Sequence, residues 1–152
     1  MDGELREVLG CTGLRMRRAT RRVTQIFDQA LQPAGITINQ FGLLAHLHGA
    51  SLGASGGLSI GALAERVDMD ATTLNRSLRP LEAKGFIRNA SDPSDGRVRM
   101  LRITRKGDEH WRMAIPYWRQ AQASVEQALG KKPLHELNEL LDLTAVKLTS
   151  LA

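Results

Sequence analysis

The sequence predicts a predominantly helical α+β fold whose few strands are confined to the middle of the chain. Three observations between Leu58 and Thr104 support it: two short capped helices joined by a tight turn, two short strands after them, and turn-forming residues between the strands. The segments on both sides carry apolar residues at helical spacing, which predicts further helices before and after this region.

The first helix of the pair is expected to begin at Ser59, because serine is a favoured N-cap and apolar residues follow at helical spacing. An Asp-Met-Asp segment interrupts this pattern, and its Asp70 is a good N-cap for the second helix. That helix has Leu74, Leu78 and Leu81 on one face. The spacing predicts that this face packs into a core.

The opposite side of the second helix is a candidate DNA-reading face. It carries Thr72, Thr73, Asn75, Arg76 and Arg79. Arginine can bind guanine and asparagine can bind adenine through two hydrogen bonds each, and threonine offers a hydroxyl and a methyl group. A second helix joined to the first by a turn can lie in a DNA major groove. A solvated polar face would have the same composition, so this helix alone leaves both interpretations open.

A basic hairpin after this helix favours the DNA-reading interpretation. Strands are expected near residues 86–88 and 98–103, and residues 92–97 between them have the Asp, Pro, Ser and Gly of a tight turn. Arg97 at the tip suits a narrow minor groove, and Asp95 could pair with it and hold it in position. Arg99 on the second strand is a further candidate for DNA contact.

The phrases DPSDGR, LRIT and TTLNRSLRPLEAKGFI together resemble the MarR family of bacterial winged-helix transcription regulators. The resemblance covers nearly the whole chain, because the flanking helices also fit in order and length. It implies a homodimer that regulates transcription, more often as a repressor, by binding a pseudo-palindromic site on double-stranded DNA. The helix residues Thr72, Thr73, Asn75 and Arg76 would then lie in the major groove and Arg97 in the minor groove. No catalytic activity and no cofactor are expected.

A chain of 152 residues has the length of one domain, so a single unit over residues 1–152 is expected. Residues 37–106 are the predicted winged helix-turn-helix lobe that binds DNA, and residues 14–32 and 107–152 are the predicted N- and C-terminal dimerisation helices. The last helix presents a leucine stripe that is hard to bury within one small protomer: Leu137, Leu140, Leu141, Leu148 and Leu151. Pairing with a second copy would bury this stripe.

The charge of the chain favours a polyanionic partner. The formal net charge is +5, and residues 58–106 hold ten Lys and Arg against six Asp and Glu, while residues 107–152 hold five against six. The N-terminal segment has no long apolar run, which argues against a signal peptide or a membrane span and makes a cytoplasmic location the expectation. A single cysteine excludes an internal disulfide framework.

Two modes of control are compatible with the sequence. The resemblance implies a pocket for a small aromatic acid between the dimerisation helices and the DNA-reading lobe, and the residues placed near it are Arg15, Phe41, His46, Trp111 and Trp118. Arg15 would neutralise the carboxylate while the rings stack on the aromatic body. The alternative is redox sensing through Cys11, which precedes the first predicted helix, where the helix dipole favours the thiolate.

Other functional classes have weaker support. A winged helix can also serve as a protein-interaction module without specific DNA binding, but the reading face and Arg97 argue against that. Residues 53–57, GASGG, match a nucleophile-elbow pattern, yet a helix precedes them where that chemistry needs a strand. The role of the Gly/Ser-rich loop 49–57 therefore stays open. His46 and His48 point to different faces of a helix, so no metal site is expected.

Overall fold

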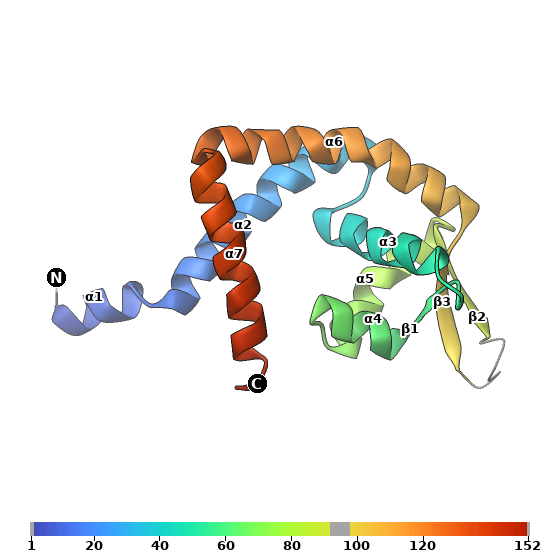
Figure 1. Cartoon of the computed structure of the whole chain (residues 1–152), viewed down its shortest axis with the longest axis horizontal. Coiled ribbons are helices and arrows are strands. Elements are labelled where there is room, and N and C mark those ends of the chain that lie inside the picture. The colour runs from blue at the N-terminus through green and yellow to red at the C-terminus, as the bar shows by residue number, and fades with distance from the viewer. Residues whose placement is uncertain (1, 92–97, 152) are drawn as a thin grey trace.

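The computed structural model describes residues 2–91 and 98–151. Its element order in Figure 1 is α1 (Gly3–Leu9), α2 (Thr12–Leu31), η1 (Gln32–Ala34), α3 (Ile38–Ser51), β1 (Leu58–Ser59), α4 (Ile60–Val67), α5 (Ala71–Ala83), β2 (Ile87–Ser91), β3 (Arg99–Ile103), α6 (Arg105–Leu129) and α7 (Lys131–Leu148). The predicted class, a mostly helical α+β fold with a winged helix-turn-helix, is confirmed. Within the described residues, no helix is long and apolar enough to cross a membrane.

The elements form a compact lobe and a helical frame (Figure 1). The lobe runs from α3 to β3 and lies beneath one half of α6. Helix α2, the other half of α6, and α7, which descends from the end of α6 and crosses α2 in this view, make up the frame. The sequence did not predict α1, which is capped by the Asp2 side chain and lies at the outer end of α2. The frame thus extends well away from the lobe.

Local capping explains where helices α3, α4 and α6 begin. The Ser59 hydroxyl accepts a hydrogen bond from the Ala62 amide at 3.1 Å, and the Thr104 hydroxyl accepts one from the Gly107 amide at 3.0 Å. Thr37 and Gln40 form the reciprocal capping box at the start of α3. Each cap satisfies an amide that has no partner within its own helix, and at Ser59 the helix begins where the sequence predicted.

The sheet has three antiparallel strands in the order β1-β3-β2. Strands β2 and β3 pair from Ile87 opposite Ile103 to Ser91 opposite Arg99, as the hairpin prediction required. Strand β1 was not predicted: it contributes only Leu58 and Ser59, opposite Leu101 and Met100. A two-residue strand has no periodicity of its own, so only the pairing with β3 makes it visible.

Small residues, rather than large ones alone, allow α6 to cover the lobe. The buried positions of α6 are Gly107, Ala114 and Ala121, spaced by seven residues, together with Val125. A Cβ on Gly107 would collide with the Phe86 carbonyl oxygen, so α6 and the turn before β2 are in close backbone contact.

A polar network also joins α3 to α6. The His48 ring stacks on Trp111 with centroids 4.5 Å apart, and its Nδ1 lies 2.5 Å from Oδ1 of Asp108. Nε of Arg112 donates to the other carboxylate oxygen at 2.8 Å. The hydrogen bond from Arg112 is the main cause, and that from His48 a second cause, of a lowered pKa at Asp108.

This network predicts that Asp108→Asn removes part of the acid sensitivity of folding. A carboxyl whose pKa is lowered by folding stabilises the protein above its ordinary value of about 4, and this contribution disappears as the pH falls through the folded-state pKa. The free energy of unfolding, measured by urea denaturation, should therefore differ most between wild type and variant at neutral pH, and the difference should shrink as the pH falls below about 4 and through the lowered folded-state pKa. Glu109→Gln is the matched control, because Glu109 forms an exposed pair with Arg105. A constant difference at every pH would contradict this prediction.

Candidate nucleic-acid interface

The candidate reading face belongs to α5, which is anchored by its apolar side. Leu74, Leu78 and Leu81 are at most 2% exposed and pack into the core of the lobe. Because these side chains fix the rotation of the helix, the other side must face solvent. The residues exposed there include all five helix candidates: Thr72, Thr73, Asn75, Arg76 and Arg79.

The cap of α5 changes what one candidate can offer to DNA. Asp70 accepts from the Thr73 amide at 2.9 Å and from the Thr73 hydroxyl at 2.6 Å. These two hydrogen bonds lower the pKa of Asp70, which keeps the cap ionised. The Thr73 hydroxyl proton is thus already used, and only its lone pairs and methyl group are available for a base. No such cap bond engages the Thr72 hydroxyl in the described residues.

A groove separates α5 from the sheet and holds basic side chains on both walls. Arg79 and Asn75 line it from α5, and Arg99 lines it from β3. It encloses about 290 Å³, and Ile60, Leu78 and Leu101 give it an apolar part of its lining. The Glu82 carboxylate also lines the groove, but an arginine on each wall suits a backbone phosphate, which binds positive charge without regard to sequence.

Sequence reasoning missed two residues of this groove. Asn89 on β2 donates from Nδ2 to Oε1 of Glu82 on α5 at 2.5 Å, and both residues line the groove. This contact ties the reading helix directly to the hairpin. The alternation of β2 places Asn89 on the same side as the buried Ile87, and that was the signal available in the sequence.

Two predicted DNA contacts, Asp95 and Arg97, lie outside the described residues. The strands on either side of them are described: β2 ends at Ser91, which pairs with Arg99 at the start of β3. The structure therefore places the base of the hairpin beside α5 and says nothing of the pairing expected between Asp95 and Arg97.

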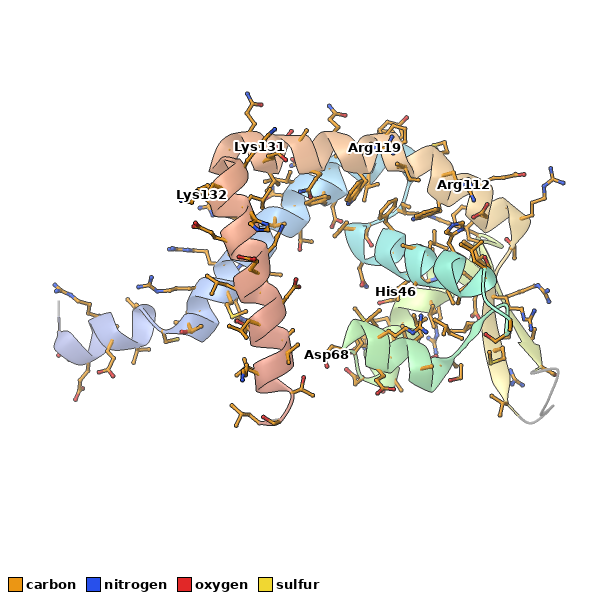
Figure 2. The ribbon with its side chains drawn as sticks, in the orientation of Figure 1. His46, Asp68, Arg112, Arg119, Lys131 and Lys132 are labelled. Carbon is orange, nitrogen blue, oxygen red and sulfur yellow. The ribbon has the colours of Figure 1, made fainter. Side chains whose placement is uncertain are left out.

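The residues assigned to an aromatic-acid pocket do not form one group. Phe41 contacts both tryptophans, with ring centroids 5.9 Å from Trp111 and 6.0 Å from Trp118. These three rings pack in the core between α3 and α6. The histidine that joins them is His48, whereas His46 lies on the side of α3 away from α6 (Figure 2). Two residues i and i+2 on a helix point in different directions, so only one of them can face α6.

Arg15 is also far from these rings. It lies in the first turn of α2, about 24 Å along the helix axis from Leu31, which packs in the core of the lobe. Its Nε donates to the Gly10 carbonyl oxygen at 2.6 Å, so it satisfies the C-terminal end of α1. The assignment of Arg15 to a site with Phe41 and Trp111 is corrected accordingly.

Cys11 occupies the N-cap position of α2, between α1 and α2. It was expected before the first helix, and the presence of α1 makes α2 the second helix of the chain. Its thiol is exposed and forms no capping hydrogen bond. Exposure makes the thiol accessible to oxidants, and the redox role remains an expectation from the sequence.

The chain is similar in sequence and in structure to known transcription regulators. A family model described as the MarR family matches residues 34–98, which span α3 to the base of β3. The structure of the Mycobacterium tuberculosis transcriptional regulator MosR in complex with DNA is similar over 92% of this chain and 98% of that chain, with 31% identity and a TM-score of 0.76. The chain belongs to the MarR family.

Two curated Bacillus subtilis relatives are consistent with MarR membership. The uncharacterized HTH-type transcriptional regulator YhbI is 26% identical over 136 residues, covering 90% of this chain and 82% of that protein. The similar regulator YxaD is 49% identical over only 47 residues, and the match spans about a third of its length. This MarR-family protein is a DNA-binding transcription regulator and not an enzyme.

Ser55, in the segment that matches the nucleophile-elbow pattern, donates its hydroxyl to the Gly57 carbonyl oxygen within a turn.

Proposed function

We propose that this regulator binds an inverted-repeat operator as a homodimer. In this proposal α5 enters the major groove through Thr72, Asn75 and Arg76, while the 92–97 segment reaches the adjacent minor groove through Arg97. The observation that carries the proposal is the opposition on α5 between fully buried leucines and an exposed Thr/Asn/Arg face. The groove with Arg79 and Arg99 on its walls gives the DNA backbone between the two contacts a place to bind.

The homodimer is supported by apolar side chains that the protomer leaves uncovered. They gather on the frame: Leu5, Val8, Leu9, Leu14, Met16, Val23 and Ile26 on α1 and α2, and Leu137, Leu140, Leu141, Leu143, Val146 and Leu148 on α7. Met16 and Val23 also line an apolar recess with Leu137 and Leu141. Apolar surface concentrated in this way is typical of a protein interface, and a second copy would cover it.

Repression follows from the same geometry. A dimer that places two reading helices about one helical turn apart covers a continuous stretch of duplex and excludes other proteins from it. A small effector would release the operator by favouring another spacing of the two lobes. A recess that supports binding of such an effector lies between α2, α3 and the turn after α4. Its lining residues include Thr24, His46 and Met69. We expect an aromatic acid to bind there, with His46 near the carboxylate.

The test of the proposed function is a selection of the purified protein against random duplex DNA at physiological salt. Enrichment of an inverted repeat with half-sites about one helical turn apart is the expected result. Weak binding without sequence preference, falling steeply with salt, would contradict it, because that is the behaviour of a basic surface alone. A protein-interaction module would then be the better explanation. Aromatic acids that lower affinity for wild type but not for His46→Ala would support the effector site.

A further inference from the structure

Arg102, a basic residue of the hairpin, is turned away from the candidate DNA surface. Arg102 on β3 donates from Nη2 to the Ser55 carbonyl oxygen at 3.0 Å, which joins the hairpin to the loop after α3. Arg102 lies opposite Arg88 in the β2–β3 register, whereas Arg99 lies opposite Ser91. Residues three apart on a strand point to opposite faces of the sheet. Arg99 therefore faces the groove beside α5, and Arg102 faces the loop.

The loop fits closely around Arg102 and its neighbour. A Cβ on Gly57 would lie 2.5 Å from the Leu101 carbonyl oxygen and 2.8 Å from Cγ of Arg102. Gly56 has a φ of +63°, and a Cβ there would lie 3.0 Å from Nη1 of Arg102. Both positions thus require glycine. The Ser55 hydroxyl bond to the Gly57 carbonyl, at 3.0 Å, holds the loop in this shape.

This contact lies at the edge of β3 that faces β1, where strand pairing is short. Strand β1 adds only two residue pairs there, while β2 pairs with the other edge over five. The Asn89–Glu82 contact ties β2 to α5 at the other edge, so the angle of the hairpin depends in part on what holds this one. We propose that Arg102 is a positioning residue for DNA binding. It clamps the 55–57 segment against β3, sets the angle at which the hairpin meets DNA, and does not itself contact DNA.

The proposal rests on the proposed function. It is tested by comparing two substitutions that each remove one positive charge from β3. Arg99→Gln should lower the salt dependence of binding by about one phosphate contact. Arg102→Gln should leave the salt dependence unchanged but reduce, by about fivefold, the preference for operators with A/T-rich over G/C-rich flanks. A loss of folded protein lowers affinity for both operators equally, so this ratio reports on positioning. Equal losses of salt dependence in the two variants, with an unchanged flank ratio, would overturn the proposal.

Gly57→Ala separates position from charge. It removes no cation, and we expect it to reduce the flank preference as Arg102→Gln does, with no further loss in the double variant. Circular dichroism checks that the Gly57→Ala variant folds. If it does not fold, the comparison of Arg99→Gln with Arg102→Gln still tests whether Arg102 positions the hairpin. Amide hydrogen exchange without DNA should rise at residues 52–57 and 99–103 in Arg102→Gln, and unchanged exchange would overturn the clamp. If the wild-type protein showed no sequence preference for DNA, the proposed function would be refuted. The hydrogen-exchange comparison needs no DNA, so it would still test the contact between Arg102 and the loop.

Discussion

Ending the chain after Gly130 should yield a monomer that no longer binds its operator specifically. The change removes α7, which carries much of the exposed apolar surface that we assign to the dimer. One lobe alone contacts one half-site, so the affinity for the full operator should fall by about 10³-fold or more, toward non-specific binding. Sedimentation velocity measures the mass, and a fluorescence-anisotropy titration measures the affinity. A truncated monomer with intact affinity would contradict both the dimer and its role.

A point variant removes an ambiguity in that experiment. Leu134 on α7 is 8% exposed and packs with Phe27, Ala121 and Val125, so the truncation also uncovers part of the protomer's own core. Leu140 is 60% exposed, so Leu140→Lys should disturb the dimer and leave the protomer folded. Asn138→Lys adds the same charge to the same helix at an exposed position outside the leucine stripe. Only the Leu140 variant should shift toward monomer and lose affinity.

The sequence was a good guide wherever a structure is determined by residues close together in the chain. Ser59 and Asp70 cap the helices they were expected to cap, because each side chain reaches an amide three residues ahead. The leucines of α5 face the core for a similar reason, since helix geometry alone puts residues i, i+4 and i+7 on one side. Once the leucine side of α5 is buried, the opposite side, with the candidate DNA-reading residues, must be exposed.

The failures concern contacts made across the fold. The choice between His46 and His48 depends on which face of α3 meets α6, and no local pattern specifies that. The distance of Arg15 from Phe41 depends on the length of α2 and on the direction in which it leaves the lobe. The role of the Gly/Ser-rich loop after α3 was open from the sequence, and the structure shows Gly57 buried against β3. Low complexity in a sequence can thus reflect close packing as well as flexibility.

Replacing Arg76 by alanine should weaken operator binding by about 1–3 kcal/mol, which corresponds to about fivefold to 150-fold in affinity. Arg76 is exposed on the reading face and forms no hydrogen bond or salt bridge that fixes it elsewhere among the described residues, so its fork is available to guanine. The variant should also relax the base preference at one position in each half-site. Quantitative binding to a set of operators with single base changes measures both effects. An affinity and a base preference equal to those of wild type would exclude Arg76 from the interface.

Arg97→Ala is the appropriate comparison, because both changes remove one arginine from the proposed interface. A minor-groove arginine responds to groove width, and a narrow groove is a property of A/T-rich sequence rather than of one base pair. We therefore expect the Arg97 variant to keep its major-groove base preferences and to lose mainly its sensitivity to flanking sequence. The two patterns of loss assign each arginine to a groove. If the Arg76 variant lost flank sensitivity and the Arg97 variant lost a base preference, α5 and the hairpin would have exchanged roles, and the docking we propose would be wrong.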